Sequence, residues 1–145
     1  MKVVLQRVTY GSVTVNSEIV GEINKGLVLL IGIGKEDTQT QANFLAEKIL
    51  NLRVFEDEDG KMNLSALDIK SEILAISQFT LYGDTKKGRR PSFIEAAPPE
   101  KAQNLYEYFV DLLKKSSLKI ETGIFKADMK VQINNDGPVT FIIEN

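Results

Sequence analysis

The chain has 145 residues, with 18 basic and 20 acidic side chains and a net charge of −2. It contains no cysteine and no histidine, which excludes a disulfide framework, a thiolate nucleophile, a Ser-His-Asp triad and zinc sites built on those residues. Any chemistry must therefore use hydroxyls, carboxylates, lysine, backbone amides, a hard metal or groups on the substrate, and any nucleic-acid site must come from local placement of charge.

The N-terminal part of the sequence predicts strands. Residues Lys2–Val8 are typical of one strand. Two short apolar runs, Val13–Val15 and Ile19–Val20, flank the polar triplet Asn16–Glu18 and indicate a hairpin. Residues Gly26–Ile33 are uniformly apolar, so they predict a central strand that is buried on both faces.

A helix and an acidic turn are expected next. Asp37 or Thr38 can cap the helix. Its apolar face is predicted at Phe44, Leu45, Ile49 and Leu52. Residues Arg53–Phe55 then predict a short strand, and Glu56–Gly60 an exposed acidic turn.

The following segment predicts an inner strand, a loop and a second helix. Residues Glu72–Gln78 form the strand, and the loop Tyr82–Pro91 is rich in turn formers. The helix is expected to begin at Pro98–Glu100, because proline suits the first helical turn. Its buried face and its basic C-terminal end are predicted at Ala102, Leu105, Phe109, Leu112, Lys114 and Lys115.

Two strands are expected at the C-terminal end, Met129–Ile133 and Val139–Ile143, joined by the turn formers Asn134–Pro138. Many short strands with two intervening helices indicate an α+β fold whose sheet curls toward a barrel. No internal repeat and no flexible linker divides the sequence, so residues 1–145 are predicted to form a single domain.

Nothing in the sequence predicts export or a membrane span. The segment Met1–Arg7 has only three consecutive apolar residues, too few for the core of a signal peptide. The longest apolar run, Gly26–Gly34, is about half as long as a spanning helix. The protein is therefore expected to be cytoplasmic, without a membrane partner.

Two possible ligand motifs fail on their spacing. The run Gly32–Glu36 resembles the end of a phosphate-binding loop, but Leu29 stands where that motif needs glycine and Glu36 where it needs serine or threonine. The acidic run around Asp57 and Asp59 lacks both end ligands of a calcium loop. A strand that ends in a glycine turn and a solvated acidic turn are the simpler interpretations.

The predicted loop carries a cluster of positive charge. Four of five consecutive positions after the turn are basic: Lys86, Lys87, Arg89 and Arg90. Such a patch can hold several phosphates of a polynucleotide against an otherwise slightly acidic protein. A solvated loop that keeps the protein soluble is the alternative, and the loop alone does not decide between them.

Two polar segments stand out as candidate site residues. The run Ser77–Leu81 ends an apolar strand, where a rigid scaffold presents polar groups to a ligand. Without a histidine, Thr80 would be a weak nucleophile, and backbone N–H groups aimed at an oxyanion are the more credible contribution. The run Asn135–Thr140 contains Gly137–Pro138 between two predicted strands. The plain alternatives are a strand end with satisfied polar groups and a hairpin turn.

Taken together, SQFTL at Ser77–Leu81 and NDGPVT at Asn135–Thr140 resemble the paired SQxxL and NxGPxT signatures of the D-aminoacyl-tRNA deacylase family. The opening Met1–Val8 and the loop Lys86–Phe93 also resemble that family, and the resemblance covers the whole chain. Two separated signatures in the right order are much more specific than either alone.

The resemblance implies an enzyme that hydrolyses the ester joining a D-amino acid to the 3′ end of a tRNA. It implies a homodimer of a small barrel-like, mostly antiparallel fold with two main helices, with no organic cofactor and no metal. In the family the Gly-Pro peptide is cis and reaches into the partner's pocket. Gly137 and Pro138 would then bind the substrate's α-amino group and clash with an L side chain, a device that cannot exclude glycine.

The same resemblance implies roles for individual residues. Gln78, Phe79 and Thr80 are expected to be catalytic through backbone N–H groups and adenosine contacts, with Ser77 as a neighbouring substrate contact. Arg7 would brace the Gly-Pro motif. In the family the 2′-OH of the terminal ribose assists, so the protein supplies orientation and oxyanion stabilisation. The basic loop would contact acceptor-stem phosphates without reading the tRNA sequence.

Two other interpretations stay open. A non-catalytic RNA-binding module would use the same basic loop and a ligand pocket, and would not need Gly137–Pro138 buried at that pocket. A carboxylate-metal hydrolase would use Asp57 and Asp59, and a chelator would then abolish its activity.

Overall fold

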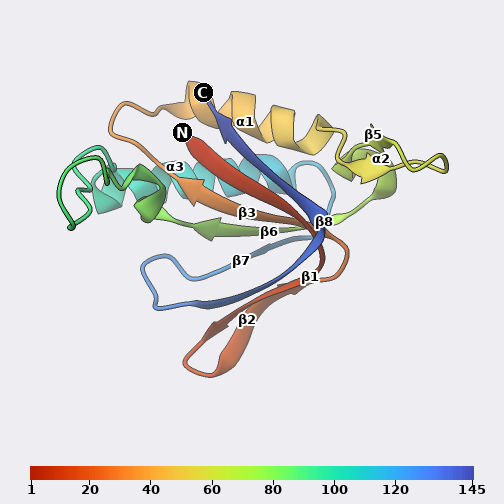
Figure 1. Cartoon of the computed structure of the whole chain (residues 1–145), viewed down its shortest axis with the longest axis horizontal. Coiled ribbons are helices and arrows are strands. Elements are labelled where there is room, and N and C mark those ends of the chain that lie inside the picture. The colour runs from red at the N-terminus through yellow and green to blue at the C-terminus, as the bar shows by residue number, and fades with distance from the viewer.

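One long strand, β1 (Lys2–Val15), organises the sheet in the computed structural model, which describes all 145 residues (Figure 1). On one side, the first half of β1 pairs with β3 (Gly26–Gly32) and its second half with β2 (Glu18–Ile23). On the other side it pairs along its length with β8 (Lys130–Glu144). All three pairings are antiparallel, and the predicted hairpin between β1 and β2 is confirmed.

The sheet continues from β3 through two parallel pairings, first to β6 (Glu72–Ser77) and then to β7 (Ile120–Thr122). β7 curls back toward β2. There the two backbones are so close that a Cβ on Gly21 would lie 2.5 Å from the Thr122 carbonyl oxygen. The sheet is therefore a nearly closed barrel, mostly antiparallel as predicted, although the sequence did not predict β7.

The expectation of two separate C-terminal strands joined by a turn is wrong. Residues Met129–Ile133 and Val139–Ile143 flank the Gly-Pro motif within one continuous course of chain, and both sides of β8 pair with β1 in the same direction. Around the motif the register with β1 shifts twice, and the Gly137–Pro138 peptide is cis. The long strand β1 pairs with both halves of β8, so the chain does not reverse at the turn formers. They form an irregularity within the strand instead.

Two main helices, α1 (Gln39–Asn51) and α3 (Pro99–Lys114), pack on one face of the sheet (Figure 1). Of the two predicted caps for α1, Thr38 is the one used: its hydroxyl accepts a hydrogen bond from the Thr40 N–H at 3.2 Å. Helix α3 begins with proline, as predicted. No helix of the protein combines the length and the apolar character that crossing a bilayer would require.

The central strand β3 is buried on both faces, as predicted, because the two faces border different cores. The larger core lies between the sheet and the helices and includes Leu5, Leu27, Leu29, Ile31, Leu45, Ile49, Ile73 and Phe109. The smaller core fills the barrel and consists of Val8, Val13, Ile23, Val28, Leu74 and Ile76. Alternate side chains of β3 enter the two cores in turn.

One predicted core position is wrong. Phe44 of α1 is 47% exposed. The buried stripe of the helix runs through Ala42, Leu45, Ala46 and Ile49. Phe44 lies about 100° around the helix from Leu45, so it falls outside that stripe.

The segment between α1 and β6 contains elements that the sequence indicated only in part. A small hairpin, β4 (Phe55–Glu56) with β5 (Met62–Leu64), encloses the acidic turn, and a short helix α2 (Ala66–Ile69) follows. The Lys61 N–H donates to Asp57 at 2.9 Å, and this bond and others within the turn lower the pKa of Asp57. The acidic run is thus an exposed turn ordered by its own hydrogen bonds.

Candidate active site

The predicted site run Ser77–Leu81 leaves the sheet at the end of β6. The Gln78 N–H still donates to the Ile31 carbonyl of β3, at 2.7 Å. The next residues form a turn of 3₁₀ helix, η1 (Phe79–Tyr82), where the sequence predicts only a strand end and a loop. The run is therefore fixed to the sheet at its first residues and projects from it at the next.

The first backbone donors of η1 are free. The N–H groups of Phe79 and Thr80 have no hydrogen-bond acceptor within the chain, as is usual at the start of a helix without a capping side chain. The side-chain amide of Gln78 donates to the Thr80 hydroxyl. These two side chains hold each other, so the pair of adjacent N–H groups is what the turn offers to a ligand.

Two glycines allow η1 to pack closely on the end of β3. A Cβ on Gly32 would lie 2.9 Å from the Leu81 Cβ and 3.2 Å from the Gln78 carbonyl oxygen. A Cβ on Gly34 would lie 2.7 Å from the Tyr82 ring. The glycine run that fails as a phosphate loop thus has a different purpose, which is to seat the turn that carries the candidate site.

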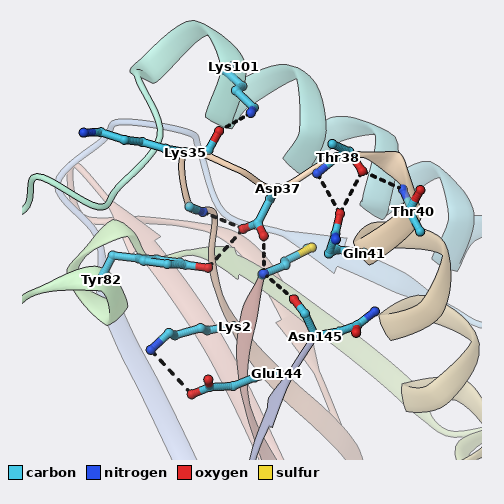
Figure 2. A network of polar contacts seen from close by, with 12 residues as sticks. Lys2, Lys35, Asp37, Thr38, Thr40, Gln41, Tyr82, Lys101, Glu144 and Asn145 are labelled. Carbon is cyan, nitrogen blue, oxygen red and sulfur yellow. Dashed lines mark hydrogen bonds and ion pairs between the residues drawn. The ribbon is translucent and has the colours of Figure 1, made fainter.

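Asp37 fixes the far end of η1 (Figure 2). The Tyr82 hydroxyl donates to Asp37 Oδ2 at 3.0 Å, and the Gly34 N–H donates to the same oxygen at 2.6 Å. The ammonium group of Met1 pairs with Asp37 Oδ1. Burial and the Asp37 charge raise the pKa of Tyr82, so its hydroxyl remains a donor. Asp37, predicted as a possible helix cap, instead joins the N-terminal ammonium group, the turn after β3 and η1.

A pocket of about 370 Å³ opens beside η1. Ser77, Gln78 and Phe79 line one side of it, whereas Thr80 does not line it. The remaining walls are mostly apolar and include Ile33, Tyr106, Phe125 and Met129. A pocket of this size and lining suits a small, flat and largely apolar group with a few polar contacts at its edge.

Phe125 and Met129 line the pocket, but the sequence did not predict them as site residues. Phe125 lies between β7 and β8, and its ring centroid is 6.0 Å from that of Tyr106. Aromatic rings and the methionine thioether offer good packing surfaces to a flat ring. One sequence carries no signal for this role, because β7, which brings the segment beside β6, is not predicted from it.

The Gly-Pro motif lies near the opposite end of β3 from η1. In β3, the residue beside this part of β1 is Leu27, and the residue beside Ser77 is Ile31. These positions are four residues apart, or about 13 Å along the strand. Gly137 and Pro138 accordingly do not line the pocket of their own chain.

Asn135 closes the irregular segment around the motif. Its side-chain oxygen accepts from the Val139 N–H at 3.1 Å, and its Nδ2 donates to the Val139 carbonyl at 3.3 Å and to Thr140 Oγ1 at 3.2 Å. Between them Gly137 has a φ of +117°, which glycine adopts far more readily than other residues. The asparagine, glycine and threonine of the second signature therefore each have a structural role in this segment.

Arg7 lies beside the glycine that it is predicted to brace. Its side chain is buried, and Nη1 donates to the Val54 carbonyl at 2.8 Å. Nη2 is 3.4 Å from Glu56, and Nε is 3.1 Å from Asp136, an ion pair in which the N–H is not directed at the oxygen. A Cβ on Gly137 would lie 3.1 Å from Arg7 Nη2.

The basic loop follows η1 directly and is closed at its base. The Asp84 N–H donates to the Ser92 carbonyl at 2.7 Å, and the Ser92 N–H donates back at 2.9 Å. The side chains of the loop are exposed and make no ion pair within the chain: Lys86, Lys87, Arg89 and Arg90. Figure 1 shows this loop projecting from the end of the molecule where η1 lies. Four unpaired cations are thus placed next to the candidate site.

Comparison with known proteins agrees with this geometry. The sequence model of the family described as D-Tyr-tRNA(Tyr) deacylase matches residues 4–144. The chain belongs to this family. A D-aminoacyl-tRNA deacylase of Clostridium botulinum (strain Eklund 17B / Type B) is 59% identical over 145 residues, which is 100% of this chain and 97% of that one. A D-aminoacyl-tRNA deacylase of Thermosipho melanesiensis is 56% identical over 146 residues, with the same coverage.

Solved structures share this deacylase fold. One described as c-Myc DNA Unwinding Element Binding Protein has a TM-score of 0.94 and 48% identity, over 100% of this chain and 99% of that one. One described as a probable eukaryotic D-amino acid tRNA deacylase has a TM-score of 0.89 over 99% and 98% of the two chains. Its identity is 17%, so that likeness concerns the fold alone. The predicted small barrel-like, mostly antiparallel fold with two main helices is confirmed.

Proposed function

We propose that the protein hydrolyses the ester bond between a D-amino acid and the 3′ end of a tRNA, in the cytoplasm, where aminoacyl-tRNA is made. The observation that carries the proposal is one juxtaposition. An apolar pocket, two free backbone N–H groups and a loop with four unpaired cations lie together at one end of the barrel. Relatives that align over the whole chain are named for this activity.

The chemistry does not need a histidine. An aminoacyl ester is an activated acyl group, and attack on its carbonyl places negative charge on the carbonyl oxygen. The N–H groups of Phe79 and Thr80 are the donors that would stabilise this charge, and such donors contribute about 10²–10³-fold each. The Gln78 side chain donates a hydrogen bond to the Thr80 hydroxyl. This contact supports a role of the Thr80 side chain in orientation rather than as a nucleophile.

The terminal adenosine would occupy the pocket. Phe125 and Met129 provide surfaces against which a purine can pack, and Ser77 and Gln78 provide polar groups at the edge. With the adenosine held there, its ribose and the ester bond would lie beside η1. Holding the ester against fixed donors supplies much of a rate enhancement, because the cost in orientation is met on binding.

A second copy of the chain would complete the site. The Gly-Pro motif lies about 13 Å along the strand from the pocket of its own chain, so a homodimer is the arrangement that could bring the two together. The outer edge of β8 pairs with no other strand, and it carries Phe141 and Ile142, which are 39% and 70% exposed. An open edge with exposed apolar side chains favours pairing with another chain.

Chiral selection follows from this arrangement. The carbonyls of the partner's Gly137 and the partner's Pro138 would accept hydrogen bonds from the substrate's α-amino group. An L side chain would then point into the motif, and a D side chain would point to solvent, so discrimination comes from a clash. Glycine has no side chain to clash, and glycyl-tRNA is a further expected substrate.

The direct test compares D- and L-aminoacyl-tRNA, with one amino acid on one tRNA, in the presence of a chelator. The purified protein should release the D-amino acid at least about 100-fold faster than the L-amino acid, the size of effect expected from a steric clash of about 3 kcal/mol. Equal cleavage of both esters would contradict the proposed selection. Loss of activity with the chelator would favour a carboxylate-metal site at Asp57 and Asp59.

The second candidate function is nucleic-acid binding without catalysis. One structure that is 48% identical to this chain is described as a DNA unwinding element binding protein, and the basic loop would suit such a role. A binding module would retain tRNA but cleave neither ester. The same assay, with a binding measurement on uncharged tRNA, separates the two functions.

The basic loop predicts salt-sensitive tRNA binding. If its four cations each contact a phosphate, the logarithm of the binding constant should fall with the logarithm of salt concentration with a slope of about −3. Replacing Lys86 and Lys87 by glutamine should reduce that slope by about 1.5. Titrations of tRNA at several salt concentrations measure it.

The matched control removes two exposed lysines from the other end of α3, Lys114 and Lys115. That double variant should retain the slope of the unmodified protein. A flat dependence on salt, or an equal reduction in both double variants, would show that the loop does not contact phosphates.

A further inference from the structure

Two aromatic rings lie exposed between the pocket and the basic loop. Phe79 is 58% exposed and Phe93 is 39% exposed, and their ring centroids are 5.0 Å apart in an edge-to-face arrangement. Phe79 lines the mouth of the pocket, and Phe93 directly follows the residues that close the basic loop. An exposed pair of phenylalanines contributes little to a core, so it suggests a ligand.

Phe93 is held in place from several directions. Its ring packs so closely on Gly83 that a Cβ there would lie 3.1 Å from Phe93 Cε1. Its carbonyl accepts from the Ala96 N–H at 3.1 Å, and the Ala97 N–H donates to the Ile33 carbonyl at 2.9 Å, which ties this segment to the end of β3. The ring is therefore presented on an ordered support, and binding would cost little conformational entropy.

The charges around the rings identify the kind of ligand. The four cations of the loop lie between Gly83 and Phe93 in the sequence, and none is paired with a carboxylate. Aromatic faces beside a row of cations bind single-stranded nucleic acid, because bases stack on the rings while phosphates contact the cations. Such stacking tolerates any base, since every base has a flat face.

We propose that Phe79 and Phe93 form a stacking platform for the unpaired nucleotide that precedes the terminal adenosine of the tRNA. This inference rests on the proposed function, because it places the terminal adenosine in the adjacent pocket. The next base then lies on the exposed rings, and its phosphates lie toward the basic loop. The platform aligns the 3′ strand and so assists entry of the ester into the site.

The test compares two substrates that differ only in that strand, D-aminoacyl-tRNA and D-aminoacyl-adenosine. In Phe93→Leu, kcat/KM for the tRNA should fall about 10-fold, within the range of one lost stacked base. Cleavage of D-aminoacyl-adenosine, which has no preceding nucleotide, should change less than about twofold, well below that range. Phe93→Tyr should restore the tRNA activity, because it keeps an aromatic face.

The matched control is Phe44→Leu, which removes another exposed phenylalanine, on α1. It should leave both activities unchanged. An equal loss with both substrates in Phe93→Leu would assign the ring a structural role and overturn the platform. So would conversion of a dimer to monomers in Phe93→Leu, measured by sedimentation, because the rings would then be covered by a second copy.

Failure of the proposed function looks different. In that case the unmodified protein would cleave neither D-aminoacyl-tRNA nor D-aminoacyl-adenosine. Cleavage of both substrates by the unmodified protein, with Phe93→Leu cleaving tRNA normally, would keep the function and reject the platform alone.

Discussion

Replacing Phe79 by proline should lower kcat/KM for D-aminoacyl-tRNA about 10²–10³-fold below that of Phe79→Ala. Both variants lose the phenyl ring, but only proline also removes the backbone N–H. That N–H has no acceptor within the chain and is one of the two donors proposed to stabilise the oxyanion. The expected ratio is the usual cost of removing one such donor.

Proline is suitable here because Phe79 is the first residue of η1, where a fixed φ and a missing donor are tolerated. The preceding residue, Gln78, has φ of −143° and ψ of 82°, which lies outside the α region that a following proline disfavours. Thermal unfolding of both variants checks that the fold is kept. Equal activities of the proline and alanine variants would remove this N–H from the mechanism.

A complete loss in Thr80→Ala, with folding and tRNA binding intact, would instead indicate a hydroxyl nucleophile.

Arg7→Ala should lower the free energy of unfolding by about 2–4 kcal/mol. The substitution leaves the buried Val54 carbonyl without its donor and opens a cavity beside Gly137. The effect should not reach that of a fully buried ion pair, because Asp136 and Glu56 are 37% and 54% exposed and can be solvated. Urea unfolding followed by circular dichroism measures it.

The same variant should also relax chiral selection, since Arg7 is proposed to brace the Gly-Pro motif. The ratio of D to L cleavage should fall, measured at a temperature at which the protein stays folded. Arg7→Lys is the conservative control, since it keeps a cation but cannot make all three contacts. A destabilised Arg7→Ala with an unchanged D to L ratio would limit Arg7 to a structural role.

Local patterns predicted the elements whose structure is decided locally. The uniform apolar run of β3, the cap at Thr38 and the proline at the start of α3 each act within a few residues, and each is found as expected. The C-terminal segment is the exception, because its structure is decided by a distant strand. The turn formers at Asn134–Pro138 have the local signature of a hairpin, but the outcome depends on β1, which is long enough to pair with both halves of β8.

The candidate site divides in the same way. The polar run Ser77–Leu81 at a strand end predicts a candidate site; Ser77, Gln78 and Phe79 line the pocket, whereas Thr80 does not. Phe125 reaches the pocket only because of the parallel pairing between β6 and β7, which involves residues far apart in the sequence. The sequence predicts Asp37 only as a possible helix cap. Its contacts with Met1 and Tyr82 join segments that are far apart in the sequence, so no local pattern indicates them.

The distance between the two signature runs has a genetic consequence. In the proposed dimer, each active site contains Ser77–Leu81 of one subunit and the Gly-Pro motif of the other. Mutations in these two segments therefore damage the contributions of different subunits to one active site. A mixed dimer of two inactive chains, one damaged at η1 and one damaged at the Gly-Pro motif, would contain one centre with both defects and one with neither. Two alleles of this gene, one inactivated at η1 and the other at the Gly-Pro motif, would therefore complement each other in one cell.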